Sequence, residues 1–423
     1  MKKILVLGAG AQGSTVAQRL DECPEVREII CADHDGKAVR RLTGNLKKAK
    51  GLQVDASVKE NITKIAEGAD LIINALPLNF GKNVLDSALQ VKADYQDFAA
   101  CENIMPAGNQ EEEWGSWVEG IKIMYNEYGP KFRKADRLAI IGTGSAPGLI
   151  CAAARKAVKE LDSCETIYNI VYEGVQARRF LPFWWSPVTA LSDMADEAYA
   201  FENGKIIKTV NFTRPIYRKY DYLDQEVRFV EHTHDEPVHM GLNSKKYFKG
   251  ARNIYFKYAG AGVDFAEPLF RAGLLSKKAE YIDGHPVVPF RVILKHLPHA
   301  PKYRDEIKEI IDEGLVSDSG CMVVEAYGKK DGVDTKIEVH VMAPGLKDSF
   351  KKAGITAEMY LTGQAGFLFT KMFLEDRYDQ KGLISSDMLT YDEIDHYFSE
   401  AEKMDITLDI RKGRDSVWKK EEA

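Results

Sequence analysis

Six residues near the N-terminus have the types and spacing of a phosphate-binding turn. The sequence Gly8-Ala9-Gly10-Ala11-Gln12-Gly13 follows the apolar run 4–7 and precedes an amphipathic stretch. In such a turn the first glycine permits a tight bend, the second lets the backbone approach a pyrophosphate, and the third lets a helix pack closely on the strand. The helix N-terminus supplies free N–H donors for phosphate. The pattern therefore predicts a dinucleotide site that includes Gly8, Gly10, Ala11, Gln12 and Gly13; the alternative is a glycine turn with a structural role only.

An acidic residue at the end of the next expected strand bears on which dinucleotide would bind. Asp33 lies 20 residues after Gly13, the spacing of a carboxylate that accepts hydrogen bonds from a ribose 2′-hydroxyl. The same carboxylate would repel a 2′-phosphate, which favours NAD over NADP. Lys37, Arg40 and Arg41 leave NADP open, because they could form a phosphate pocket, although solvated helix charges are the more ordinary interpretation.

Later strand ends are expected to line the rest of the cofactor, because parallel sheets bind ligands at the carboxyl ends of their strands. On this basis Asp55 and Ala56 fall near the adenine. A second group is expected alongside the pyrophosphate and the nicotinamide ribose: Ala75, Leu76 and Pro77.

Two further segments fall at strand ends where a nicotinamide would lie. One is Tyr95-Gln96-Asp97-Phe98, and the other is the glycine-rich stretch 142–148, which contains Gly144. The proline and glycines of the second segment suit a strand-to-helix turn with exposed backbone N–H groups. Asp97 is a candidate for chemistry on the substrate, and the alternative is a helix N-cap or turn aspartate.

The elements that would position these residues alternate regularly over the first 150 residues. Apolar runs at 3–7, 28–32, 52–54, 71–76, 93–98 and 138–141 predict six strands, and the amphipathic stretches 14–20, 36–48, 58–65, 80–91 and 114–133 predict helices between them. Alternating strands and helices indicate an α/β fold, with a Rossmann-type, doubly wound parallel sheet.

The pattern changes after about residue 165. Strands are predicted at 166–172, 205–209 and 321–327, and Asn203-Gly204 and Asp331-Gly332 are typical two-residue hairpin turns. This part therefore predicts an α+β domain with a mixed sheet. Helical patterns return at 362–375 and 391–404.

Taken in order along the chain, these motifs resemble the saccharopine dehydrogenase-like family of oxidoreductases, which includes saccharopine reductases, lysine 6-dehydrogenase and carboxynorspermidine dehydrogenase. The resemblance rests on the turn 6–13, the strand end 74–77, Tyr95-Gln96-Asp97, the turn 144–149, and the later segments 184–187, 202–205, 362–363 and 381–384. It implies a dinucleotide-binding domain formed by 1–147 and about 350–423, with a C-terminal helical return, and a substrate and dimerisation domain formed by 148–349.

The resemblance also implies hydride transfer at the carbon of an amino acid C–N bond. Such a substrate needs a guanidinium or backbone N–H donors for its carboxylate and an acceptor for its ammonium group. Arg178 and Arg179 are the preferred carboxylate ligands, with Arg214 and Arg218 as further candidates; the alternative is that these arginines are surface or interface charges. Asp97 could orient or deprotonate the amine. Two aromatic residues complete the predicted substrate site: Tyr95 and Trp185.

Three functional hypotheses follow. The first is an NAD(P)-dependent amino acid dehydrogenase of the saccharopine or lysine 6-dehydrogenase type, with a small-molecule amino acid as substrate. The second is a reductase that joins an amine to an aldehyde or keto acid, of the carboxynorspermidine or opine type. The third is a dinucleotide-binding sensor without catalysis, because a fold does not guarantee chemistry.

Composition and charge limit the classes of partner that the sequence favours. Lys and Arg number 58 and Asp and Glu 64, a net charge of −6, so no basic excess favours nucleic acid or an anionic membrane. No apolar run reaches the roughly 18 residues of a membrane-spanning helix. The six cysteines lack a paired motif and indicate reduced thiols in a cytoplasmic protein, with Cys101 as a possible site residue. A homodimer is the default expectation.

One histidine-rich segment invites a metal interpretation. His232, His234 and His239 could supply imidazole ligands, but their spacing matches no common zinc motif. Their neighbours Asp235, Glu236 and Pro237 favour a polar, pH-sensitive surface loop instead. No metal is therefore expected.

Overall fold

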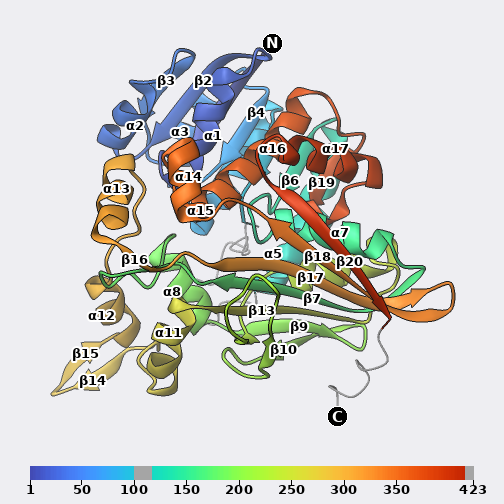
Figure 1. The fold of residues 1–423 in the computed structure, drawn as a ribbon. Helices are drawn as coiled ribbons and strands as arrows, with labels where there is room; N and C mark the ends of the chain where they lie inside the picture. The colour runs from blue at the N-terminus through green and yellow to red at the C-terminus, as the bar shows by residue number, and fades with distance from the viewer. Residues whose placement is uncertain (100–116, 415–423) are drawn as a thin grey trace. The chain divides into compact units, whose positions relative to one another are not determined.

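The structure is a computed structural model that describes residues 1–99 and 117–414 (Figure 1). The chain divides into two compact units. The first contains Met1–Ala152 and Leu361–Met404, and the second contains Ala153–Tyr360 and the described residues from Asp405 onward. The expectation that everything after about residue 350 joins the first unit needs correction, because residues 407–414 form a strand that pairs within the second unit's sheet.

The first unit contains a seven-stranded sheet. Its strands are β1 (Lys2–Leu7), β2 (Val26–Asp33), β3 (Ala49–Gln53), β4 (Leu71–Asn74), β5 (Asp94–Asp97), β6 (Leu138–Ile141) and β19 (Gly382–Ser385). They lie in the order β19-β6-β5-β4-β1-β2-β3, and every pair is parallel. The predicted doubly wound parallel sheet is thus confirmed. The winding reverses at β1, between β4 and β2, and this switch point is where such sheets bind ligands.

Two details of this sheet differ from the sequence prediction. β3 begins at Ala49 rather than at residue 52, because it is an edge strand with mostly exposed side chains and therefore carries no apolar run. β19 adds a seventh strand beside β6, where six were predicted. Its four residues are all buried, but they are too short a run to be distinguished from a loop by periodicity.

Helices pack on this sheet. Val16, Ala17 and Leu20 face the apolar strands, and Phe367 and Leu374 from the C-terminal part of the chain join the same core. Within the described part of the chain, no helix combines the length and the apolarity needed to cross a membrane. The described α-helices of this unit are α1 (Ala11–Glu22), α2 (Gly36–Thr43), α3 (Lys59–Ile65), α4 (Gly81–Val91), α5 (Trp117–Ile123), α6 (Gly129–Lys134), α16 (Ala365–Leu374) and α17 (Tyr391–Glu402), and α7 (Leu149–Lys159) runs across the division between the units.

The second unit contains a mixed sheet, as predicted, and this sheet has nine strands (Figure 1). Its strands are β7 (Ser163–Glu173), β9 (Ala198–Glu202), β10 (Lys205–Thr209), β11 (Ile216–Arg218), β12 (Val227–Glu231), β13 (Asn253–Gly260), β17 (Gly320–Lys330), β18 (Val333–Met342) and β20 (Thr407–Arg414). The pair β7–β13 is parallel and the other pairs are antiparallel. Both predicted hairpins form, and each has positive φ angles at its two turn residues.

The remaining elements of the second unit are short. The helices are α8 (Pro187–Ala195), α9 (Glu236–Leu242), α10 (Ser244–Tyr247), α11 (Ala261–Arg271), α12 (Pro289–His296), α13 (Arg304–Glu313), α14 (Leu346–Ala353) and α15 (Ala357–Met359). Two small pairs of strands complete it: β8 (Gln176–Ala177) with β16 (Leu315–Ser317), and β14 (Glu280–Ile282) with β15 (His285–Val287).

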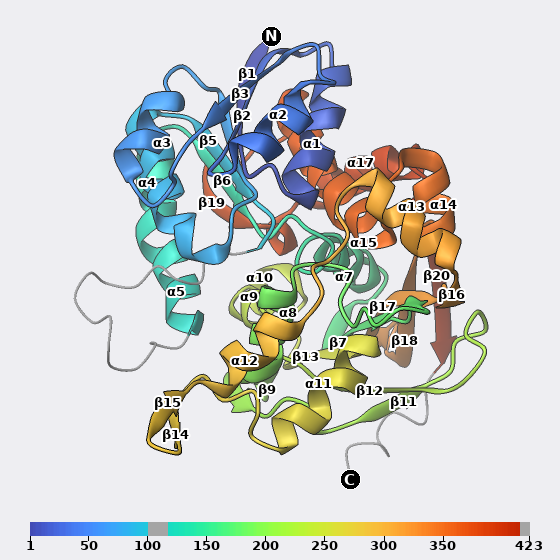
Figure 2. The ribbon, with the colours of Figure 1, turned by 90° about the vertical axis from the view of Figure 1, so that its left-hand side faces the viewer.

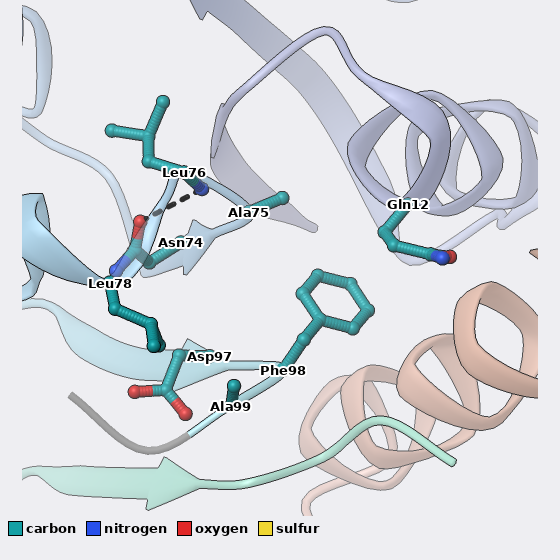
Figure 3. Close-up of a pocket in the computed structure, with 8 residues that line it drawn as sticks. All are labelled: Gln12, Asn74, Ala75, Leu76, Leu78, Asp97, Phe98 and Ala99. Carbon is teal, nitrogen blue, oxygen red and sulfur yellow. Dashed lines mark hydrogen bonds between the residues drawn. The ribbon is translucent and has the colours of Figure 1, made fainter. Parts of the chain in front are cut away.

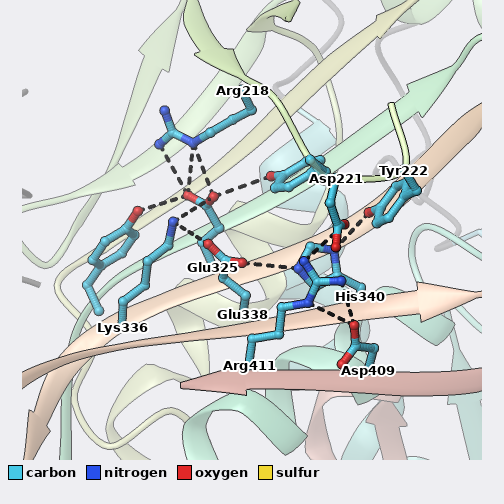
Figure 4. Close-up of polar contacts among 11 residues, drawn as sticks. Arg218, Asp221, Tyr222, Glu325, Lys336, Glu338, His340, Asp409 and Arg411 are labelled. Atoms are coloured by element: carbon cyan, nitrogen blue, oxygen red, sulfur yellow. Dashed lines mark hydrogen bonds and ion pairs between the residues drawn. The ribbon is translucent and has the colours of Figure 1, made fainter. Parts of the chain in front are cut away.

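A polar network crosses strands β17, β18 and β20 of the second sheet (Figure 4). At its centre the fully buried carboxylate of Glu325 accepts hydrogen bonds from Arg218, Lys336 and Tyr327 at 3.1, 2.9 and 2.9 Å. Nearby, Glu338 pairs with Lys336 at 2.6 Å and with His340 at 3.1 Å. A buried charge is tolerated only when it is paired and hydrogen-bonded in this way.

This network makes stability depend on pH. The hydrogen bond with His340, helped by Lys336, lowers the pKa of Glu338 from 4.5 to about 2. Because this folded-state pKa lies below the unfolded one, the stabilisation is complete above about pH 4.5 and is lost as pH falls towards 2. Glu338→Gln is expected to lower the free energy of unfolding at pH 7 by at most about 3 kcal/mol, reduced by solvent screening. Urea unfolding of the wild type and of Glu338→Gln from pH 7 to 2 should show that the difference between their free energies of unfolding shrinks as the pH falls. A difference that stays constant would contradict this prediction, as would an equal effect from the control Glu226→Gln, at an exposed residue.

Candidate functional site

The glycine turn between β1 and α1 leaves an open space at one of its three glycines. Gly8 has a φ of +101°, and a Cβ there would lie 2.5 Å from the carbonyl oxygen of Ala75. A Cβ on Gly13 would lie 2.0 Å from the carbonyl oxygen of Gly8, whereas a Cβ on Gly10 would meet nothing within 4 Å. Packing within the protein therefore requires glycine at the first and third positions, but not at the second. The free space at Gly10, at the start of α1, fits the approach of a pyrophosphate.

Asp33 braces this turn from the end of β2. Its Oδ2 accepts a hydrogen bond from the backbone N–H of Ala9 at 2.7 Å, and its Oδ1 accepts one from the N–H of Asp35 at 2.9 Å. A carboxylate has about four acceptor positions, so capacity remains for a ribose hydroxyl. Its binding to ribose stays a prediction. Lys37, Arg40 and Arg41 are exposed on the following helix α2.

The other predicted cofactor residues lie at the ends of further strands of the same sheet. Ala75, which follows β4, donates its N–H to the carbonyl oxygen of Leu7 at 2.8 Å, so the segment Ala75–Pro77 adjoins the glycine turn. Gly144 follows β6, and its N–H donates to the carbonyl oxygen of Phe98. Asp55 follows β3 as an exposed residue whose carboxylate accepts hydrogen bonds from Ser57, and Ala56 beside it is buried.

A small pocket of about 150 Å³ opens between the ends of β4 and β5 and the start of α1 (Figure 3). It has room for part of a ligand. Its lining combines apolar surface with a few polar groups, as is typical of binding sites. The lining residues are Gln12, Asn74, Ala75, Leu76, Leu78, Asp97, Phe98 and Ala99.

A chain of hydrogen bonds fixes the buried acid of this pocket. Asp97 is 2% exposed; its Oδ2 accepts from the Tyr95 hydroxyl at 2.9 Å, and its Oδ1 accepts from the N–H of Gly142 at 2.8 Å. Asn74 donates to the Tyr95 hydroxyl at 3.1 Å and accepts from the N–H of Leu76. Asp97 thus links β5 to the end of β6 and is not a helix N-cap. Tyr95 is fully buried, and its hydrogen bond to Asp97 gives it the position of a residue that orients this carboxylate; its contact with a substrate stays a prediction.

The predicted substrate residues Arg178, Arg179 and Trp185 belong to the second unit. Arg179 pairs with Glu309 at 2.8 Å and with Glu313, which fits the alternative of a surface charge. Arg178 is exposed, and its N–H donates to the carbonyl oxygen of Gly314. The indole of Trp185 donates to Glu173 at 3.2 Å. Their contacts with a substrate stay predictions.

The remaining arginine candidates are also engaged within the protein. Arg214 pairs with Glu231 at 2.8 Å and with Glu202, and Arg218 belongs to the network around Glu325. Cys101, the thiol singled out in the sequence, lies outside the described residues, as does the start of the helix predicted from residue 114.

The histidine-rich segment is the clearest disagreement with the sequence. It is not a surface loop: His232 is 2% exposed and Glu236 is fully buried. The ring of His232 stacks on Tyr258 with centroids 4.7 Å apart, and that of His234 stacks on Phe256 at 4.0 Å. The potential ligand atoms of His234, Asp235 and Glu236 lie within 4.8 Å of one another, so the segment forms a polar cluster that spacing alone did not reveal.

Comparisons with known proteins show which families the chain resembles. Residues 4–126 match the family model described as saccharopine dehydrogenase NADP binding domain. Carboxynorspermidine synthase of Vibrio alginolyticus is 24% identical over 412 residues, which cover 92% of each chain. Carboxyaminopropylagmatine dehydrogenase of a Synechocystis species is 29% identical over 393 residues, which cover 91% of this chain and 92% of that one.

A solved structure shares the fold. Apo saccharopine dehydrogenase (L-Glu forming) from Saccharomyces cerevisiae superposes with a TM-score of 0.67 at 16% identity, covering 98% of this chain and 100% of that one. The cofactor class is NAD(P), as the family model and the free space at Gly10 both indicate. Residues 4–126 therefore match the saccharopine dehydrogenase NADP-binding domain, and over most of its length the chain is similar to saccharopine dehydrogenase-like oxidoreductases.

Proposed function

We propose that this protein transfers hydride between NAD(P) and the carbon of a C–N bond in an amino acid substrate. One observation carries the proposal: the glycine turn with its free space at Gly10 and the pocket that contains Asp97 lie at the carboxyl edge of the same sheet. A dinucleotide on the turn therefore has a buried carboxylate within the same unit. The pairing of a cofactor site with a buried acid is what amine oxidation or imine reduction requires.

The names of the relatives narrow the substrate class. Carboxynorspermidine and carboxyaminopropylagmatine each denote a polyamine that bears a carboxyl group. These names support a substrate with a carboxylate, a C–N bond and a further amino group. They favour the second hypothesis from the sequence, the reductive joining of an amine to a carbonyl compound, as the direction of the reaction.

The proposed reaction balances as follows. The amine and the carbonyl compound lose water to form an imine; one hydride and one proton then convert the imine to a secondary amine, and NAD(P)H becomes NAD(P)⁺. When bound, the nicotinamide supplies the hydride. The buried carboxylate of Asp97 lines the pocket and accepts hydrogen bonds from Tyr95 and Gly142, and a carboxylate in this position can hold the ammonium form of the amine or exchange its proton.

The test is a spectrophotometric assay at 340 nm. NADH and NADPH are each offered with an amine alone, a carbonyl compound alone, and the two together; NAD and NADP are offered with lysine, saccharopine and other amino acids. Loss of absorbance only when both partners are present supports reductive joining. Oxidation of a single amino acid supports the dehydrogenase type. Fluorescence-detected binding of NADPH with no turnover in any mixture supports the non-catalytic sensor and contradicts the proposal.

Asp33 is expected to set the preference between the two nucleotides. Removing its charge in Asp33→Asn keeps an acceptor for the N–H of Ala9 but removes the repulsion of a 2′-phosphate. The ratio of the Kd for NADPH to that for NADH is expected to fall about tenfold, the effect of one charged hydrogen bond. Fluorescence titration with both nucleotides measures it. An unchanged ratio would mean that Asp33 only braces the turn.

A further inference from the structure

A hairpin and a short helix form an arm on the second unit. The arm, defined here as residues 280–296, contains β14, the turn Asp283-Gly284, β15 and α12. β14 and β15 pair with each other as a separate two-stranded sheet. In both views the hairpin stands away from the nine-stranded sheet of the same unit (Figure 1, Figure 2).

The base of the arm is fixed to the body of the second unit. Phe290 is 8% exposed, and its N–H donates to the carbonyl oxygen of Ser276 at 3.1 Å. Nζ of Lys277 lies 5.4 Å from the centre of the Phe290 ring and 2.6 Å from Oδ1 of Asp196, which follows α8. These contacts hold the residues on both sides of the hairpin, so the hairpin projects from a fixed base.

The rest of the arm exposes large apolar side chains to solvent. Tyr281 is 78% exposed, Ile282 is 54% exposed, and Val292 on α12 is 44% exposed. A two-stranded hairpin is marginally stable in water unless another surface packs on it. Exposed aromatic and aliphatic side chains that lie close together are typical of a protein–protein contact. These features indicate that another protein surface covers the arm.

The charges of the arm are divided between its two parts. The hairpin contains Glu280 and Asp283 and no lysine or arginine, so it carries a charge of −2. The helix α12 contains Arg291 and Lys295 and no acidic residue, so it carries +2 with histidine counted as neutral. All four side chains are exposed, and within residues 1–99 and 117–414 none of them pairs with an opposite charge. A surface that fits the arm must offer bases to the hairpin and acids to the helix.

A second copy of the arm meets this requirement. In a two-fold symmetric dimer the same contact occurs twice, with the roles of the two copies reversed. The acidic hairpin of each copy then lies on the basic helix of the other. The half-buried Ile293 and Leu294 add to the aliphatic surface that α12 offers to the hairpin.

We propose that the arm is a self-association surface, through which two copies of this chain form a two-fold symmetric dimer with the hairpin of each copy on α12 of the other. The aromatic and aliphatic side chains supply most of the affinity, and the exposed charges select the partner and its orientation. This surface belongs to the second unit only, and the association does not depend on the reaction proposed above.

Sedimentation velocity of the full chain, over a range of concentrations, measures the association. The wild type is expected to sediment as a dimer, with twice the chain mass of 47.5 kDa, and to dissociate more readily at high salt, which screens exposed charges. Tyr281→Ala should raise the dimer Kd by about a hundredfold, because a side chain that contributes about tenfold occurs twice in the interface. The matched control is Tyr217→Ala, at a tyrosine that is 53% exposed on β11, and it should dimerise like the wild type.

Exchange of charges distinguishes a second copy from any other partner. A hairpin variant, Glu280→Lys with Asp283→Asn, makes both parts of the arm positive; asparagine suits the φ of +49° at residue 283. A helix variant, Arg291→Glu with Lys295→Glu, makes both parts negative. Each variant by itself should be monomeric, because like charges then meet at both contacts. An equimolar mixture of the two should form dimers again, and so should a chain that carries all four substitutions.

The outcomes decide between the arm and other surfaces. A wild type that sediments as a monomer at every concentration overturns the proposal. A dimer that none of the arm variants weakens also overturns it, as does a dimer that is lost in Tyr217→Ala but kept in Tyr281→Ala, because the interface then lies elsewhere. Dimers that are lost in both charge variants and restored by mixing them support it, and this recovery also shows that both variants fold.

Discussion

Replacing Gly10 with valine is expected to weaken NAD(P)H binding by about a hundredfold while the fold survives. A Cβ at this position meets nothing within 4 Å, and Gly10 has an extended backbone, with φ −78° and ψ −164°, that valine adopts readily. The two added methyl groups would instead fill the space that a pyrophosphate must approach. Losing one or two charged hydrogen bonds from backbone N–H groups corresponds to roughly that factor.

Fluorescence titration with NADPH, beside circular dichroism and thermal unfolding, measures both parts of this expectation. Gly13→Val is the contrasting variant, because its Cβ would lie 2.0 Å from the carbonyl oxygen of Gly8. It should lower the melting temperature as well as the affinity. If Gly10→Val binds NADPH as the wild type does, the free space at the turn is not the phosphate site.

The first sheet is largely predictable from sequence because its signals are local. Strands such as Ile4–Leu7 and 71–74 are buried on both faces and therefore read as short apolar runs, while the helices between them show an amphipathic period. The glycine turn is recognised from local sequence too, because its three glycines have a fixed spacing between a strand and a helix, although the contact that requires Gly8 comes from Ala75 at the end of β4. The exceptions are the edge strand β3, which is exposed, and β19, which reaches β6 from the far end of the sequence.

The histidine-rich segment shows what cannot be predicted from local sequence. His232 and His234 look like members of a polar loop because their sequence neighbours are polar. They are buried because β13, which begins some twenty residues later, places Phe256 and Tyr258 against them. Likewise Arg214 and Arg218 look available for a substrate until the structure brings Glu231 and Glu325 to them. Contacts between distant segments decide these cases, and spacing along the chain does not record them.

Asp97→Asn is expected to lower kcat by about 10² to 10⁴, the usual contribution of a positioned acid or base, with little change in NADPH affinity. The substitution should fold normally. Asparagine can accept the N–H of Gly142 through Oδ1, and the Tyr95 hydroxyl can turn to accept from the new amide group. What is lost is the charge that holds an ammonium and the capacity to exchange its proton. Stopped-flow absorbance at 340 nm measures the rate of hydride transfer, with the substrates that the spectrophotometric assay identifies.

Asp94, at the opposite end of β5 from Asp97, provides a matched control. Asp94, the first residue of β5, accepts a hydrogen bond from the N–H of Leu138 at the start of β6, much as Asp97 does from Gly142 beyond the end of that strand. If both aspartates only tie β5 to β6, Asp94→Asn and Asp97→Asn should reduce stability and kcat alike. If Asp97 acts on the substrate, only its variant should lose turnover. Tyr95→Phe should then cause a smaller loss of about tenfold, since it removes one hydrogen bond that orients Asp97 and leaves the carboxylate in place.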